Sequence, residues 1–128
     1  MSELPNKYQA LQQFWELFGW PAYNENTVPD NALDAGGYIT YEAATDSIDN
    51  AVLLSASLWR RASGWTAIHA KAQEIADYIE REMPPSIPIK DGRMVIRKAT
   101  PFAQDGADDD DTIRRVNLNI YVEFLNVA

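Results

Sequence analysis

Apolar and polar side chains alternate along residues Ile113 to Leu125, and this alternation constrains the fold more than any other feature of the chain. A period of two is that of a β-strand, whose successive side chains point to opposite faces. The chain is therefore expected to contain a sheet with one covered face and one wetter face. The apolar set is Val116, Leu118, Ile120, Val122 and Phe124, and the opposite set is Arg115, Asn117, Asn119, Tyr121 and Glu123.

Three further strands are predicted from the same kind of pattern. The clearest is Val52 to Arg61, with one face made by Val52, Leu54, Ala56 and Leu58. Shorter strands are predicted from Tyr38 to Ala44 and from Arg93 to Ala99. Residues 45–51 have the composition of a turn, so the strands on either side of them are expected to form a hairpin.

Two amphipathic helices are predicted, from about Pro5 to Phe18 and from the 63–66 segment to about Met83. Gly19 and Pro21 end the first helix, and Pro84 with Pro85 ends the second. Apolar residues recur at spacings of three and four in both. The first stripe is Leu4, Tyr8, Leu11, Trp15 and Phe18, and the second is Ile68, Ala72, Ile75, Ala76, Ile79 and Met83.

The order of these elements is α-β-β-α-β-β, which predicts an α+β fold. We expect a four-stranded, mostly antiparallel sheet with the two helices packed on one face. Residues 1–128 are expected to form a single domain, because their number suits one core and no internal repeat or boundary is visible. The long connection from Trp20 to Gly37 is expected to be an ordered arm, because it contains apolar residues that pack.

The charge and composition limit the kind of partner. The formal net charge is −8, which disfavours binding to nucleic acid irrespective of its sequence. There is no cysteine, no signal-like start and no apolar stretch long enough to cross a membrane, so we expect a soluble protein kept inside a cell. Much of the excess charge lies in one short segment, which holds Asp105, Asp108, Asp109, Asp110 and Asp111.

No motif in the chain predicts catalysis or a cofactor. The contiguous aspartates between Asp105 and Asp111 lack the alternating spacing and the late glutamate of a calcium loop, so a solvated acidic loop is expected rather than a metal site. His69 is the lone histidine and sits on the second predicted helix, where an exposed helical residue is expected. There is no glycine-rich phosphate loop and no His-x-x-x-His pair.

Two roles are possible for the aromatic and basic residues near the second strand. They pack in the core or at its rim, or they form a contact between subunits, where Trp and Arg are enriched. The face of the second strand opposite Val52 carries unexpected apolar residues, so either the protein itself or a neighbouring subunit covers it. The residues proposed for a subunit interface are Leu53, Trp59, Arg61, Trp65 and Tyr121.

The pattern of elements resembles a family of phage proteins. The stretches that carry the likeness cover nearly the whole chain: Pro29-Asp30, the strand 38–42, Asp46 to Asn50, the strand 52–61, Ser63-Gly64-Trp65 before the long helix, Pro101 to Gln104, the acidic loop and the strand 113–125. In this order they are similar to the tail-terminator, or tail-completion, proteins of long-tailed phages and prophages, which are often labelled minor capsid proteins.

The resemblance implies a structural role without catalysis or cofactor. Members of this family cap the tail tube as a ring, usually hexameric, and form the surface that joins the head. It implies contacts with the tail-tube protein and head–tail connector proteins, assembly in the host cytoplasm, a place in the virion tail and no membrane. The acidic loop would line a lumen through which the genome passes without specific binding.

Two other classes of function stay open. One is another head–tail connector or a tail-tube component of the same assembly. The other is an unrelated α+β domain that binds a small molecule or is an enzyme, which would need a deep pocket containing His69 or paired carboxylates.

Overall fold

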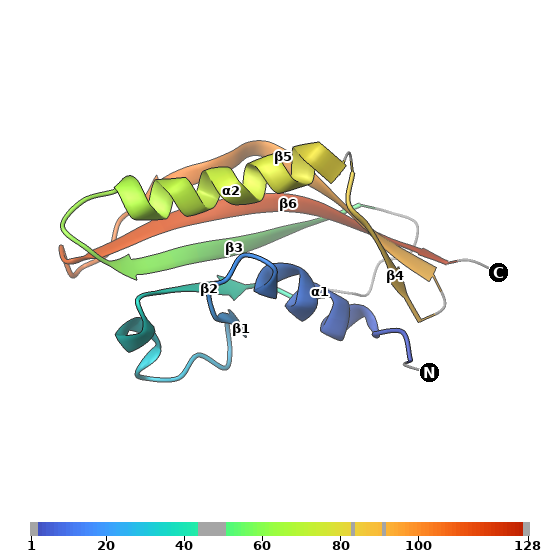
Figure 1. Ribbon diagram of the computed structural model, residues 1–128, viewed down its shortest axis with the longest axis horizontal. Helices are drawn as coiled ribbons and strands as arrows, with labels where there is room; N and C mark the ends of the chain where they lie inside the picture. Colours follow the sequence, from blue (N-terminus) through green and yellow to red (C-terminus); the bar gives the residue numbers. More distant parts are fainter. Residues whose placement is uncertain (1–2, 44–50, 83, 91, 127–128) are drawn as a thin grey trace.

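The computed structural model describes residues 3–43, 51–82, 84–90 and 92–126, and it has a layer of helices against one curled sheet (Figure 1). The predicted turn at residues 45–51 and the predicted helix end at Met83 fall almost entirely outside these residues. The elements in chain order are α1 (Lys7–Glu16), β1 (Ala22–Asn24), the 3₁₀ turn η1 (Ala32–Ala35), β2 (Gly37–Tyr41), β3 (Val52–Arg61), α2 (Thr66–Glu82), β4 (Ser86–Ile89), β5 (Gly92–Gly106) and β6 (Ile113–Asn126).

The prediction of a four-stranded, mostly antiparallel sheet is wrong. The sheet has six strands in the order β1-β2-β3-β6-β5-β4, and it is mixed because β1 runs parallel to β2. Both added strands are at the edges, and both are short, with three residues in β1 and four in β4. β1 lies inside the arm, and β4 contains Pro88, a residue that favours edge positions.

β5 is much longer than predicted. It continues past Ala99 to Gly106, and its pairing with β6 shifts register between Lys98 and Ala103, around Pro101. Such an irregularity interrupts the alternation by which a strand is recognised in a sequence. The extension makes β5 and β6 a long hairpin, with the acidic loop at its tip (Figure 1).

The core lies between the helices and one face of the sheet. The predicted apolar set of β6 is buried, and it meets Leu54, Ala56 and Leu58 of β3. In α2 the buried residues are Ile68, Ala72, Ile75, Ala76 and Ile79, as the helical period predicts.

The stripe predicted for the first helix is partly confirmed, because Leu11, Trp15 and Phe18 are buried. Leu4 and Tyr8 are 53% and 59% exposed, whereas Ala10 and Phe14 are fully buried beside Leu11. A capping box fixes the start of this helix: Asn6 accepts a hydrogen bond from the amide of Gln9, whose side chain accepts one from the amide of Asn6.

The arm from Trp20 to Gly37 closes one side of the core. β1 pairs with β2, and the Trp20 ring lies over the backbone of Gly37, where an added Cβ would be 2.6 Å from ring carbons. The cations of Arg60 and Lys71 lie 5.9 and 5.4 Å from the Trp20 ring centroid. The arm is therefore held mainly by packing and cation–π contacts, because its strand β1 forms only a short run of backbone pairing with β2.

Candidate assembly surface

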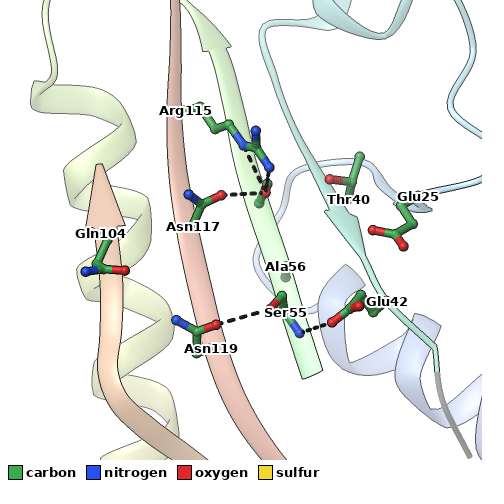
Figure 2. Close-up of a pocket in the computed structure, with 10 residues that line it drawn as sticks. Glu25, Thr40, Glu42, Ser55, Ala56, Gln104, Arg115, Asn117 and Asn119 are labelled. Atoms are coloured by element: carbon green, nitrogen blue, oxygen red, sulfur yellow. Dashed lines mark hydrogen bonds between the residues drawn. The ribbon is translucent and has the colours of Figure 1, made fainter. Parts of the chain in front are cut away.

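The face of the sheet opposite the helices, called here the open face, has a polar row at its centre. Ser57 and Ser55 of β3 donate hydrogen bonds of 3.0 and 3.1 Å to the side-chain oxygens of Asn117 and Asn119 on β6 (Figure 2). Beside them the Glu42 carboxylate accepts a 2.6 Å hydrogen bond from the Ser55 amide. These groups line a shallow hollow of about 330 Å³.

An aromatic group lies at one end of this polar row. The Trp59 indole N–H donates a 2.9 Å hydrogen bond to the Thr40 hydroxyl, and the Tyr38 ring stacks on Trp59 with a centroid distance of 6.1 Å. The Arg115 guanidinium lies 4.6 Å from the centroid of the Trp59 ring. Burial is the main reason why the pKa of Tyr38 is raised, with a smaller contribution from Asp108. Trp59 is therefore a half-buried anchor of the open face.

An exposed apolar pair lies at the other end. Leu53 and Tyr121 are directly opposite each other on β3 and β6, and they are 54% and 41% exposed. Arg97 of β5 is opposite Tyr121 on its other side and is also exposed. Large apolar side chains left in the open on a sheet face are typical of a contact surface.

Arg61 lies beside the acidic loop rather than beside the apolar pair. Its guanidinium is 3.3 Å from the Asp110 carboxylate and donates a 2.6 Å hydrogen bond to the Thr112 hydroxyl. Asp110 also accepts hydrogen bonds from the hydroxyl and amide of Thr112, and these, with a smaller effect of Arg61, hold its pKa below the usual range.

The acidic loop is exposed but has internal order. Asp108 accepts a 2.9 Å hydrogen bond from the amide of Asp110, and Asp109 and Asp111 are exposed. Asp105, at the end of β5, lies 2.7 Å from Nε2 of His69. The loop is thus a hydrogen-bonded turn at the hairpin tip, joined to α2 through His69.

Trp65 does not lie with the other residues proposed for an interface. It is half-buried and packs against the core on the helix side, with the His69 ring stacked at 5.3 Å and the Arg114 guanidinium 5.3 Å from its centroid. Leu53, Trp59, Arg61 and Tyr121 are on β3 and β6, where the period of two places them on the open face. Sequence reasoning missed Tyr38, Thr40 and Arg97, because pairing between strands, not spacing along one, brings them to this face.

The described residues hold no cluster of three or more acidic, histidine or cysteine side chains that could bind a metal. His69, the histidine considered for catalysis, has Asp105 beside it at the edge of a small groove rather than in a deep pocket. Among the described helices, none has the length and hydrophobicity to cross a membrane.

Comparisons with known proteins give a fold match. No protein-family model matches the chain, and no curated protein matches it. Among solved structures, the chain is similar to a chain from a structure described as the virion of a native gene transfer agent particle, with a TM-score of 0.59 and 20% sequence identity. The match covers 93% of this chain and 91% of that chain, so the two share a fold over nearly their whole lengths.

Proposed function

We propose that the chain is a structural protein of a phage-like virion, and more specifically a tail terminator. The observation that carries this proposal is the fold match to a chain of a gene transfer agent virion, a phage-like particle, over more than nine-tenths of both chains. In this role, copies of the protein close the end of the tail tube as a hexameric ring, stop its polymerisation and form the surface that joins the head.

The open face supports an assembly role. The chain's own helices cover the opposite face of the sheet, so the exposed Leu53 and Tyr121 side chains are available to another protein. The partners in this proposal are further copies of the chain, the tail-tube protein and head–tail connector proteins. The protein assembles in the host cytoplasm and stays in the virion tail, and it needs neither enzymatic activity nor a cofactor.

The charge of the acidic loop is consistent with a lumen through which DNA passes. Its carboxylates are exposed at the tip of the β5–β6 hairpin and would repel the phosphates of a passing genome, which therefore does not bind. Replacing Asp105, Asp108, Asp109, Asp110 and Asp111 together by Asn should leave the protein folded and impair tail function. A collapse of stability in that variant would instead assign the loop a structural role.

The test is native mass spectrometry of the purified protein over a wide range of concentrations, with and without purified tail-tube protein. A hexamer, alone or on the tube, supports the terminator role. A chain that stays monomeric and does not bind the tube overturns it. The position of the protein in purified virions separates the alternatives: one ring at the tube end is expected for a terminator, many rings along the tail for a tube protein, and a ring inside the neck for a connector.

A further inference from the structure

We propose that copies of the chain join front to back, with the apolar end of the open face of one copy seated in the groove between α2 and the segment that directly follows α1 in the next. The first surface, the Leu53 patch, consists of Leu53, Tyr121 and Arg97. The second, the helix groove, lies in the helix layer on the other side of the sheet. The inference rests on the ring assembly of the proposed function and names the two surfaces that form each contact.

The Leu53 patch has the composition of an interface centre. Its apolar side chains are about half exposed, at 54% for Leu53 and 41% for Tyr121. Arg97 is exposed and makes no ion pair with any described residue. In this patch Leu53 and Tyr121 contribute apolar area, the Tyr121 hydroxyl can form a hydrogen bond, and Arg97 can form an ion pair with another protein.

The helix groove has a volume of about 650 Å³. Leu17, Phe18, Ala70 and Tyr78 supply its apolar lining, and Leu17 is 54% exposed. The two sides of the groove are in contact, because the Phe18 ring, just past the end of α1, meets the Tyr78 ring of α2 edge to face at 5.5 Å. A groove of this size accepts an apolar side chain from a partner.

The charges at the two surfaces are complementary. At the groove, Asp77 accepts a hydrogen bond from Gln73 and is in no ion pair with a described residue. It is therefore available to Arg97 of another copy. The Leu53 patch is bordered by Glu123, and the groove by Arg81, but the Arg81 guanidinium already lies 3.7 Å from the Glu82 carboxylate. The charge complementarity of the contact therefore rests on Arg97 and Asp77.

The two surfaces are on opposite faces of the molecule, so one copy cannot join its own patch to its own groove. Contact between different surfaces of identical chains is heterologous, and it propagates until the rotation between copies closes a ring. The acidic loop takes no part in this contact and stays free to face a lumen.

The test exchanges the charges of the contact in two separate variants. Arg97→Asp places two carboxylates against each other, and Asp77→Arg places two cations against each other. Each alone is expected to raise the concentration for half-maximal assembly by roughly tenfold or more, because like charges then face each other. An equal mixture of the two should assemble like the wild type, since every patch then meets a groove of opposite charge in an alternating ring.

Asp30→Arg is the matched control, since Asp30 is exposed in the arm and belongs to neither surface. This variant should assemble normally alone and should not restore assembly to Arg97→Asp. Circular dichroism melting of each variant tests that it is folded. Normal assembly of both single variants, or no recovery in their mixture, overturns the contact while leaving binding to tail-tube protein as an intact test of the proposed function. A wild type that stays monomeric up to roughly 1 mM also overturns it.

A crosslink gives a direct second measurement, because the chain has no cysteine of its own. A mixture of Leu53→Cys and Leu17→Cys proteins should form a mixed disulfide between copies under mild oxidation. Within one chain these positions are on opposite faces, beyond the reach of a disulfide. Dimers formed by Leu53→Cys alone would indicate patch-to-patch contact and would contradict the front-to-back arrangement.

Discussion

The two faces of the central strands differ in how their residues are held, although both faces come from the same backbone. On the helix side, Leu54, Leu58 and the apolar set of β6 are buried in a continuous core. On the open face, Ser55 and Ser57 are joined to Asn119 and Asn117 by hydrogen bonds, with aromatic rings at one end and an exposed apolar pair at the other. On the helix side, burial of apolar area makes the largest contribution to the free energy of unfolding. On the open face, hydrogen bonds within the protein replace hydrogen bonds to water, so their net contribution to stability is small.

The largest effect is expected from a cavity on the helix side. Leu118 is fully buried, and Leu118→Ala should lower the free energy of unfolding by about 2–5 kcal/mol, because both apolar contact and packing are lost. The neighbouring Asn119→Ala on the open face should cost about 1 kcal/mol or less. Urea unfolding measures both. Equal losses for the two variants would contradict the division between the faces.

The arm gives the next largest effect. Gly37→Ala would place a Cβ 2.6 Å from carbons of the Trp20 ring, so the ring or the strand must shift. Such overpacking is expected to lower the free energy of unfolding by about 1–3 kcal/mol. The matched control is Gly64→Ala, where an added Cβ meets no atom within 4 Å. If both variants melt at the temperature of the wild type, the arm does not close the core in the manner described.

A smaller effect is expected at the aromatic end of the open face. Thr40→Val keeps the shape of the side chain but removes the acceptor of the Trp59 indole N–H. The free energy of unfolding should fall by about 1–2 kcal/mol if the Trp59 indole N–H is left without an acceptor. Trp59→Phe combined with Thr40→Val removes both partners, and the coupling of the two changes in a double-mutant cycle measures the hydrogen bond. Strict additivity would show that this bond contributes nothing to the open face.

The smallest effect on stability is expected at the acidic loop, and it depends on pH. Because the pKa of Asp110 in the folded state lies below that of an ordinary aspartate, the interactions of its carboxylate stabilise the folded state at any pH above the ordinary pKa. This contribution is lost as the pH falls through the folded pKa. Asp110→Asn should therefore lower the melting temperature slightly at neutral pH. Its melting temperature should also fall less than that of the wild type between neutral and strongly acid pH. An unchanged pH profile would show that Thr112 and Arg61 do not act on this carboxylate.

The regular alternation and helical periodicity predicted the buried faces of the regular elements, but not the six-stranded mixed sheet that they form. The buried sets of β6, β3 and α2 follow directly from periods of 2 and 3.6, because a regular element points every second residue, or one stripe, in the same direction. The same reasoning failed where the pattern is broken. β1 is too short to show a period, and β5 passes through a register shift. In the first helix the prediction held for Leu11, Trp15 and Phe18. It was wrong for Leu4 and Tyr8, which fit a helical spacing but are exposed.

The sequence by itself determined that the chain makes a sheet with one apolar face, amphipathic helices to cover it and an acidic segment between its last two strands. Only the tertiary structure decided which exposed residues lie together, because β3 and β6 are far apart in the chain and their pairing sets the neighbours. That pairing brings Leu53 against Tyr121 and Trp59 beside Arg115, while the fold turns Trp65 into the helix side. Local periodicity fixes the direction of a side chain within its own element, but the contacts across elements depend on register and packing, which no short stretch of sequence encodes.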